Sequence, residues 1–557
     1  MKPTYTLRSI VAISLFLLAL AGCGGAGSGS STTTGTGSTG TGGTGTGGTG
    51  TGGATTTSVT AAARLLDQAT FGPTTADVAH VQSVGISGYL TEQYAATQTT
   101  LPILPNPLPV QCTNNPSSCF ESEFWQTELT AHDQLRQRVA FSLGELFVAS
   151  TQGVDANSMV PYYNTLSADA FTNWRTIMED VTLSPAMGLY LNMLNSSKPA
   201  TGQIANENFG REMLQLFSTG INKLNIDSSL QLDAGGNPIP VYTETQVEAF
   251  ARAYTGWTYG NAAGAAVTKF PSSSYYFAPM APLDTSHDMA TKIVLDGTVI
   301  AAGGTAKSDL KAALDNIFNS STLPPFICKQ LIQHLVTSTP SAGYISRVAN
   351  VFINNGSGVR GDMKSVLTAI LTDTEARAGD TNASFDGGHL REPMLYLTSA
   401  MRGLSYTNTN TDATNLWAYA GLSGYSSSLG EQPMRSPSVF NFYPPGYVIP
   451  NTTINAPEFS LENTASVNLR LSLANTLSQG KFSLFATDLT KTSTLGVIAA
   501  DPGNLADTLG IIFLHGQMPA NMRATIVSAV TPLTDYGQRV RFAVYLVLSS
   551  SQYKVMH

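Results

Sequence analysis

Residues 135–146, LRQRVAFSLGEL, decide the fold class of this chain. Leucine and valine recur in this stretch at intervals of four, four and three positions, which places them on one face of an α-helix. Residues 363–371, MKSVLTAIL, repeat the pattern, and helical periodicity dominates from Val59 onward. We therefore expect a mainly α fold: a large multi-helical body with sparse short β-hairpins or irregular extended segments.

Breaks between the helices are also marked in the sequence. Residues 232–239, LDAGGNPI, indicate a turn or hairpin, and residues 258–300 look irregular with short extended pieces. Thr243 and Gln246 have the spacing of a capping box, which predicts a helix start. Three glycines are expected to end helices: Gly72, Gly85 and Gly220.

The N-terminus is organised like a bacterial lipoprotein signal. Lys2 and Arg8 precede a short apolar segment, and Leu20-Ala21-Gly22-Cys23 follows it in the manner of a lipobox. We expect residues 1–22 to be a cleaved signal peptide and the thiol of Cys23 to carry the lipid that anchors the protein to a membrane. The alternative is an ordinary secretory signal with an incidental cysteine.

A low-complexity tract follows Cys23. Residues 24–57 contain only Gly, Thr, Ser and Ala, a composition that cannot bury enough apolar surface to offset the entropy of ordering. We therefore expect residues 23–57 to be a lipidated cysteine with a flexible tether. No later linker interrupts the chain, so residues 58–557 are predicted to form a single large helical domain. A division of this domain into two lobes is the alternative.

Composition limits the classes of partner. The chain has a net charge of −8 and only 12% charged residues. Cleavage of the signal would remove the positive charges of Lys2 and Arg8 and make the protein more acidic still. So acidic a protein is not expected to bind nucleic acid. No later segment has the 18 uninterrupted apolar residues of a membrane span. We expect an exported protein that its lipid alone anchors, on the periplasmic face or the cell surface.

The remaining cysteines divide into a pair and a single residue. Cys112 and Cys119 lie in a Pro- and Asn-rich loop, and an oxidising compartment favours a disulfide between them. Cys328 belongs to an apolar stripe with helical spacing, so it is predicted to be buried and inert.

Polar residues gather most densely in Asn206-Glu207-Asn208-Phe209-Gly210-Arg211-Glu212. On a helix Glu207 and Arg211 would lie four residues apart on one face, and Glu248 and Arg252 repeat this spacing before Trp257. Such pairs either stabilise single helices at the surface, or form a buried network that joins two helices or lines a pocket. For Arg211 we expect a mostly buried side chain with more than one acceptor.

Candidates for reactive groups outside these helices are few. In His287-Asp288 the carboxylate could orient the imidazole, and either residue could bind a metal, but a metal site needs three or four ligands. A loop-stabilising pair is the simpler interpretation. His334 shares the polar side of its helix with Gln330 and Gln333, which predicts exposure to solvent. No common hydrolase, phosphate-loop or haem motif is present, so the catalytic residues are unknown and neither a cofactor nor a metal is predicted.

Aromatic residues cluster at Tyr275-Tyr276-Phe277 and around Phe440 to Tyr447. If exposed, they could stack on sugars or receive a segment of a partner protein, and otherwise they seal the helical core beneath a long connection. The candidate functional or network residues of the whole chain are Asn206, Glu207, Asn208, Arg211, Glu212, Glu248, Arg252, Trp257, His287, Asp288, Lys292, Arg391 and Glu392.

Several ordered segments resemble one protein family. They are Arg64-Leu65-Leu66 with Ala69-Thr70-Phe71-Gly72, Asn206 to Glu212, Ala251 to Trp257, His287-Asp288 with Lys292, Arg391-Glu392-Pro393, and Ser438 to Tyr443 followed by Pro445 and Tyr447. Over residues 60–555 the chain resembles the domain of unknown function 1800 family. Gln215 departs from the family's more usual Glu, which weakens a three-carboxylate cluster. The resemblance implies a bacterial, exported protein without an established activity, encoded near sulfatase-like proteins.

We therefore expect a lipid-anchored envelope protein that serves as an accessory or binding protein for an exported partner, with a sulfatase-like protein as the candidate. The alternative is an extracytoplasmic hydrolase that uses the Glu207/Arg211/Glu212 and His287/Asp288 regions, and a third option is a structural surface component. Convergence of these residues on an open pocket would favour the enzyme. A closed ion-pair network beside an exposed apolar patch would favour the binding protein.

Overall fold

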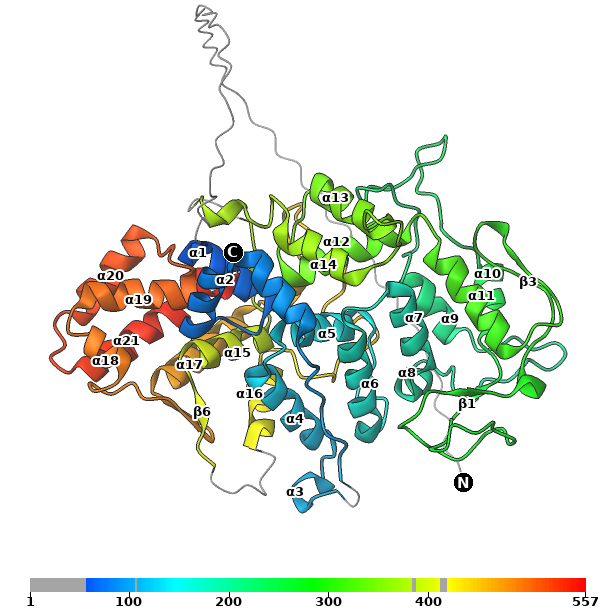
Figure 1. The fold of residues 1–557 in the computed structure, drawn as a ribbon, viewed down its shortest axis with the longest axis horizontal. Helices are drawn as coiled ribbons and strands as arrows, with labels where there is room; N and C mark the ends of the chain where they lie inside the picture. Colours follow the sequence, from blue (N-terminus) through cyan, green and yellow to red (C-terminus); the bar gives the residue numbers. More distant parts are fainter. Residues whose placement is uncertain (1–56, 106–107, 383–386, 411–417, 557) are drawn as a thin grey trace, which may run out of the picture. The chain divides into compact units, whose positions relative to one another are not determined.

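The helical stretch of residues 135–146 forms α5 (Gln134–Leu146) in a computed structural model of the protein. The structure describes residues 57–105, 108–382, 387–410 and 418–556. Leu135, Val139 and Leu143 are completely buried on α5, as their spacing predicts. The mainly helical fold is confirmed (Figure 1). The predicted signal peptide, Cys23 and nearly all of the tether lie outside the described residues.

The helices before the central irregular region follow one another closely. They are α1 (Val59–Ala69), α2 (Thr75–Ala95), α3 (Val110–Thr113), α4 (Ser117–Thr130), α5 (Gln134–Leu146), α6 (Ala156–Asp169), α7 (Trp174–Leu183), α8 (Pro185–Tyr190), α9 (Asn208–Gln215) and α10 (Glu244–Ala253).

The later helices are α11 (Ala306–Phe318), α12 (Leu323–Leu335), α13 (Ala342–Ile353), α14 (Met363–Thr372), α15 (Pro393–Gly403), α16 (Leu422–Ser428), α17 (Thr464–Ser478), α18 (Thr494–Ile498), α19 (Pro502–Leu514), α20 (Ala520–Val530), α21 (Tyr536–Leu548) and α22 (Ser551–Lys554). Short 3-10 helices connect them: η1 (Asp284–Ser286), η2 (Leu295–Gly297), η3 (Ala378–Asp380), η4 (Ala418–Gly421) and η5 (Pro457–Leu461).

The strands are short and pair antiparallel. They are β1 (Trp257–Thr258), β2 (Ala281–Pro282), β3 (Lys292–Ile293), β4 (Val299–Ile300), β5 (His389–Leu390), β6 (Thr407–Asn408), β7 (Lys481–Phe482), β8 (Phe485–Ala486) and β9 (Val555–Met556). β1 pairs with β2, β3 with β4 and β5 with β9, and β8 lies between β6 and β7. The pairing of β5 with β9 fixes the chain just before Glu392 against its C-terminal end.

Most of the predicted helix boundaries are found. Thr243 and Gln246 form the capping box of α10, each side chain facing the other residue's backbone N–H. Gly72 and Gly220 follow α1 and α9 with positive φ. Gly85 also interrupts a helix as predicted, because its φ of 76° is not helical and α2 consists of two helical pieces joined across a kink at this residue.

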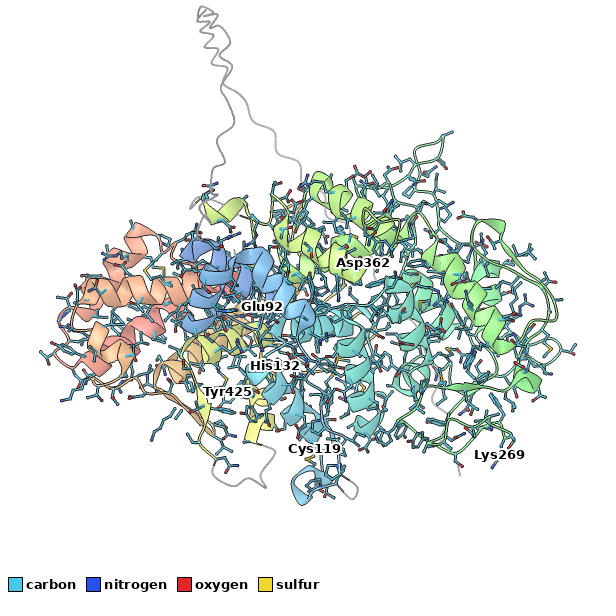
Figure 2. The ribbon with its side chains drawn as sticks, viewed as in Figure 1. Glu92, Cys119, His132, Lys269, Asp362 and Tyr425 are labelled. Atoms are coloured by element: carbon cyan, nitrogen blue, oxygen red, sulfur yellow. A yellow bond between two sulfur atoms is a disulfide. The ribbon has the colours of Figure 1, made fainter. Side chains whose placement is uncertain are left out.

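The segment of residues 232–239 turns as expected. The carboxylate of Asp233 accepts from the backbone N–H groups of Gly235 and Asn237, and Leu232 bridges to Pro238. The disulfide between Cys112 and Cys119 is also present and joins α3 to α4. Figure 2 shows it at the label of Cys119. Cys328 is buried, and its burial raises the pKa of its thiol.

The centre of the helical body is built around α5 and α12. Figure 1 shows α19, α20 and α21 on one side of these helices and α7, α9, α10 and α11 on the other. α12 packs against α5 and β5, and β5 packs against η5, so four distant segments meet there. Among the described residues, every helix is too short or too polar to cross a membrane.

A buried ion network holds the chain just before α15. Arg391 donates to both carboxylate oxygens of Asp67 on α1, at 2.9 and 2.6 Å. His515 Nε2 lies 2.9 Å from the same carboxylate, and the guanidinium of Arg391 stacks on the ring of Tyr553. α1, β5 and the end of α19 are thus tied together, which fixes the position of the neighbouring Glu392.

Candidate metal centre

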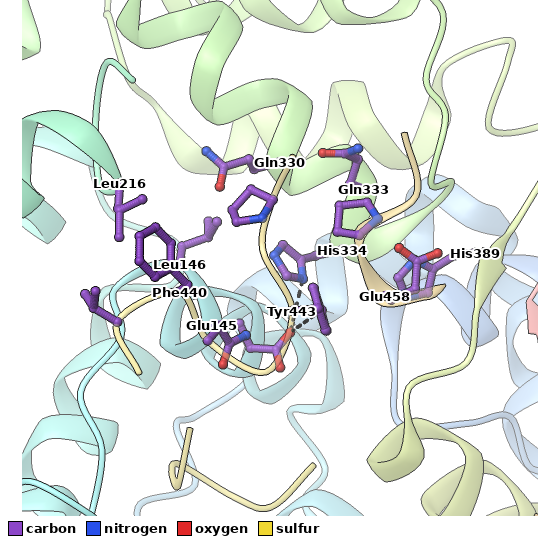
Figure 3. Close-up of a pocket in the computed structure, with 14 residues that line it drawn as sticks. Glu145, Leu146, Leu216, Gln330, Gln333, His334, His389, Phe440, Tyr443 and Glu458 are labelled. Carbon is purple, nitrogen blue, oxygen red and sulfur yellow. Dashed lines mark hydrogen bonds and ion pairs between the residues drawn. The ribbon is translucent and has the colours of Figure 1, made fainter. Parts of the chain in front are cut away.

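A pocket of about 40 Å³ lies beside the C-terminal ends of α5 and α12. Glu145 projects from the last turn of α5, and His334 from the last turn of α12. Glu392 directly precedes α15, and Tyr443 lies in the connection from α16 to η5. Figure 3 shows His334 and Tyr443 directed toward Glu145. These four polar side chains, three of which line the pocket, therefore come from four separate segments of the chain.

Three of these residues have the spacing of metal ligands. His334 Nδ1 lies 3.1 Å from Glu145 Oε2 and 3.9 Å from Glu392 Oε1. The three side chains are buried, and one ligand atom from each lies within 4.8 Å of the other two. Metal–ligand bonds of about 2.0–2.2 Å in a tetrahedral site place neighbouring ligand atoms about 3.3–3.6 Å apart. The two distances from His334 lie just outside this range, one on each side.

The carboxylates at this site have fewer donors than acceptors. The hydroxyl of Tyr443 donates to Glu392 and also lies 3.2 Å from Glu145 Oε2. Among the described residues no hydrogen-bond partner faces two further buried carboxylate oxygens: Glu145 Oε1 and Glu392 Oε2. Buried acceptors without donors are costly. A cation is the group that would satisfy several of them at once.

Two neighbouring carboxyl groups differ in their protonation. Burial and the charges of Glu392 and Glu145 raise the pKa of Glu431 well above its usual range, while its Oε2 accepts from the backbone N–H of Met394 at 2.8 Å. Burial alone would also raise the pKa of Glu392, but the neighbouring His389 and the other nearby positive charges outweigh burial and lower it. The pKa values of these two carboxyl groups are therefore shifted in opposite directions.

His389 lies beside Glu392. Its Nε2 lies 3.5 Å from Glu392 Oε1, and its Nδ1 lies 3.5 Å from Glu458 Oε1. Glu458 is held in turn by Ser338 and by the backbone N–H of Leu390. Burial alone would lower the pKa of His389, but the two carboxylates outweigh it and raise the pKa. His389 therefore lies at ion-pair distance from both carboxylates, and among the described residues neither of its ring nitrogens has a hydrogen-bond partner.

The donor set indicates which ions suit the site. One imidazole and two carboxylates favour a divalent ion of intermediate hardness, such as Zn²⁺, Mn²⁺ or Fe²⁺, over a Cys-rich structural zinc site. Three protein ligands also leave a coordination position for water or substrate. On the apolar side of the pocket lie Leu146, Leu216 and Phe440 (Figure 3).

The predicted Glu207–Arg211 pair forms at the surface of α9. Arg211 donates to Glu207 Oε2 at 2.8 Å and bridges to Glu244, the first residue of α10. The side chain of Arg211 is 34% exposed and that of Glu244 is 64% exposed. The expected second acceptor is present, but the expectation of a mostly buried Arg211 is wrong. Glu212 is half-buried beside this bridge.

The second predicted pair does not form. Arg252 lies 3.6 Å from Asp288 Oδ1 and donates to Thr291 O at 2.8 Å; within the described part of the chain it makes no ion pair with Glu248. Trp257 is buried on β1 opposite Pro282. The exposed Asn206 accepts from the backbone N–H of Asn208 and so begins α9.

His287 and Asp288 belong to a network that fixes a loop. His287 Nδ1 lies 2.9 Å from Thr255 O, and its Nε2 lies 3.2 Å from Asp309 Oδ2. The buried ammonium of Lys292 donates to the same Asp309 oxygen at 2.7 Å. Across the described residues, the contacts of His287 and Asp288 stay within this network and reach neither Glu207–Glu212 nor Glu392. The two regions proposed for a hydrolase are therefore separate groups.

Sequence reasoning missed most of the pocket. Glu392 and Tyr443 lie in segments that carry the family resemblance, but nothing singled out Glu145, Glu431 or Glu458. The prediction of a solvent-exposed His334 is wrong, since only 9% of the residue is exposed. Gln330 and Gln333 are buried with it, because the polar side of α12 faces the pocket. A polar helix face beside a Tyr- and Pro-rich segment was the available signal.

Comparison with known proteins gives a family but no activity. The family model described as "Protein of unknown function (DUF1800)" matches residues 64–555. No curated protein and no solved structure matches the chain. The matched range contains Glu145, His334, Glu392 and the remaining pocket residues.

Proposed function

Since the chain belongs to the DUF1800 family of proteins of unknown function, we propose its function from its own geometry: a metal-dependent hydrolase whose ion is bound by Glu145, His334 and Glu392. The observation that carries this proposal is the group of three buried ligand atoms within 4.8 Å of one another. Buried carboxylate oxygens without donors surround this group. Few arrangements other than a bound cation would make so many buried acceptors favourable.

Hydrolysis is the reaction class that this environment suits. A divalent ion lowers the pKa of a bound water toward neutrality. The hydroxyl of Tyr443 donates to Glu392 and lies 3.2 Å from Glu145 Oε2, so it holds the two carboxylate ligands in place. The small, partly apolar pocket limits the approach of bulk water.

The binding-protein function expected from the sequence stays a prediction, as does the sulfatase-like partner. The hydrolase alternative moves to new residues, because the pocket gathers Glu145, His334 and Glu392 and not the Glu207 and His287 regions. We further propose that the enzyme acts at the bacterial envelope through a lipid on Cys23. The signal-like residues 1–22 and the lipobox support this location.

Metal analysis tests the proposed centre. We expect about one equivalent of a transition ion per full-length chain after purification without chelators, measured by inductively coupled plasma mass spectrometry. Glu145→Gln and His334→Gln should each lose most of it. His80→Gln is the matched control, because His80 is an exposed histidine that pairs with Glu92 at the surface. Wild-type protein without metal, also after dialysis against Zn²⁺ or Mn²⁺, would contradict the proposal.

Activity is a separate measurement on the same samples. We expect at least one member of a panel of p-nitrophenyl esters, phosphates and sulfates to be hydrolysed, with loss of activity on chelation and recovery with the native ion. Peptide and glycoside substrates extend the panel. If the protein binds the metal but hydrolyses none of these substrates, the proposed hydrolase activity is refuted and the protein is a metal-binding protein.

A further inference from the structure

A second pocket, which shares no lining residue with the first, is built around Asp169 and Asp180. It has a volume of about 270 Å³. We propose that it binds a primary alkylammonium group, such as the side chain of lysine or a free alkylamine. The proposal is independent of the metal centre and of any hydrolase activity.

Both carboxylates lie at C-terminal ends of helices. Asp169 is the last residue of α6, and Asp180 is in the last turn of α7, which packs against α6. Unpaired carbonyl groups give a helix C-terminus roughly half a negative charge, which favours cations and disfavours carboxylates. Two such ends and two carboxyl groups meet at this pocket. The local field therefore favours a positively charged ligand.

One of the two carboxyl groups also has a buried oxygen without a hydrogen-bond partner. Asp169 is only 7% exposed, and its Oδ2 has no hydrogen-bond partner among the described residues. The nearest cation on α7, Arg175, is engaged with Glu179 and Asp315. Burial and the Asp180 carboxyl group raise the pKa of Asp169 to about 7, so the two groups share a proton at lower pH. A shared proton occupies the position that a ligand cation would take.

The walls of the pocket suit an alkyl chain. Leu183, Pro185, Phe277 and Pro279 line it beside the two carboxyl groups. The ring of Phe277 is 41% exposed and stands at the rim, where an aromatic face attracts a cation. An alkylammonium matches both features, since its stem contacts apolar carbon while its head donates up to three hydrogen bonds.

A metal ion fits this pocket less well. Among the described residues, no third Asp, Glu, His or Cys joins the two carboxylates to form a metal-binding group. Transition-metal sites normally have three or four protein ligands, and a small hydrated ion would leave the apolar walls unused. Binding of the ammonium displaces the shared proton to solvent, so the charge of the site stays balanced.

Calorimetric titration of the full-length protein tests this inference. We expect n-pentylamine to bind saturably at pH 6, at least tenfold more tightly than 1-pentanol, which has the same alkyl chain without the charge. Titrations in buffers of different ionisation enthalpy should show proton release. Nα-acetyl-lysine methylamide distinguishes the source: tighter binding than pentylamine indicates a peptide side chain, and weaker binding a free amine.

Variants assign the binding to this pocket. Asp169→Asn should weaken pentylamine binding at least tenfold, whereas Asp227→Asn, in an exposed turn, should leave it unchanged. Phe277→Ala changes a rim residue whose loss should not impair folding, and it should weaken binding severalfold even if Asp169→Asn does not fold. Equal affinity for pentylamine and pentanol would overturn the inference. So would unchanged binding in both pocket variants, or Ca²⁺ binding that excludes the amine and requires Asp169.

Discussion

His334 Nδ1 and Glu145 Oε2 lie 3.1 Å apart, each on the final turn of its own buried helix. This contact brings the polar ends of α5 and α12 together at the pocket. Arg138 strengthens the junction, because it donates to the backbone carbonyl of His334 and, at 2.9 Å, to Ser142 within α5. The candidate metal centre thus depends on the packing of two helices.

Chelation should lower the stability of the protein. A ligand at about a thousand times its Kd stabilises the folded state by about 4 kcal/mol, so removal of a bound ion should reduce Tm by several degrees. Differential scanning calorimetry with and without EDTA measures this change. His334→Gln should show a low Tm and no response to EDTA. A wild-type Tm that EDTA leaves unchanged would argue against the ion.

Arg391→Ala should destabilise the fold strongly. It would leave the buried carboxylate of Asp67 without its two charge-assisted hydrogen bonds, and breaking a buried pair costs about 3–5 kcal/mol. Urea unfolding monitored by circular dichroism gives the free energy. Arg347→Ala is the control, since its pair with Asp373 involves a half-exposed arginine. Similar losses in the two variants would contradict a special role for the Arg391 network.

Arg211→Ala should have a small effect. Its bridge to Glu207 and Glu244 is largely solvated, and exposed ion pairs contribute less than about 1 kcal/mol. The same urea titration should place this variant close to wild type, with the difference shrinking further in high salt. A loss of several kcal/mol would restore the buried-network interpretation for α9.

Glu123→Gln should change the pH dependence of stability. Burial raises the pKa of Glu123 from 4.5 to about 7, so the folded protein holds this proton more tightly than the unfolded chain. The resulting stability is complete below pH 4.5 and is lost as the pH rises through about 7. The free energy of unfolding of the variant, taken relative to that of the wild type, should therefore rise by up to about 3 kcal/mol between pH 4 and pH 8. Urea titrations at both pH values measure it, and a constant difference would refute the shift.

Cys23→Ser should abolish membrane anchoring. The thiol is the expected acceptor of the lipid, so the variant should remain uncleaved or be released from the membrane. Labelling with a fatty-acid analogue and detergent partitioning report the two effects. Cys328→Ser is the control, because Cys328 is buried within the helical body. Unchanged labelling of Cys23→Ser would favour the ordinary secretory signal.

Local patterns predicted the helices well. The spacing in residues 135–146 predicted α5, and Thr243 with Gln246 predicted the start of α10, because both signals act within one or two turns of the chain. Gly85 is a further local signal, since its positive φ interrupts the helical path of α2 at the position that the sequence marks.

The sequence by itself determined the helical fold class, the turn at residues 232–239, the Cys112–Cys119 pair and the family. Only the tertiary structure decided the candidate site. Glu145, His334, Glu392 and Tyr443 come from segments far apart in the chain. Glu145 and His334 look ordinary in their own segments, and the family resemblance that covers Glu392 and Tyr443 assigns them no role. Metal-binding geometry requires atoms within a few ångströms. Such proximity arises when α5, α12 and the segment before α15 bury their apolar faces together, and local periodicity does not encode which helix ends will meet.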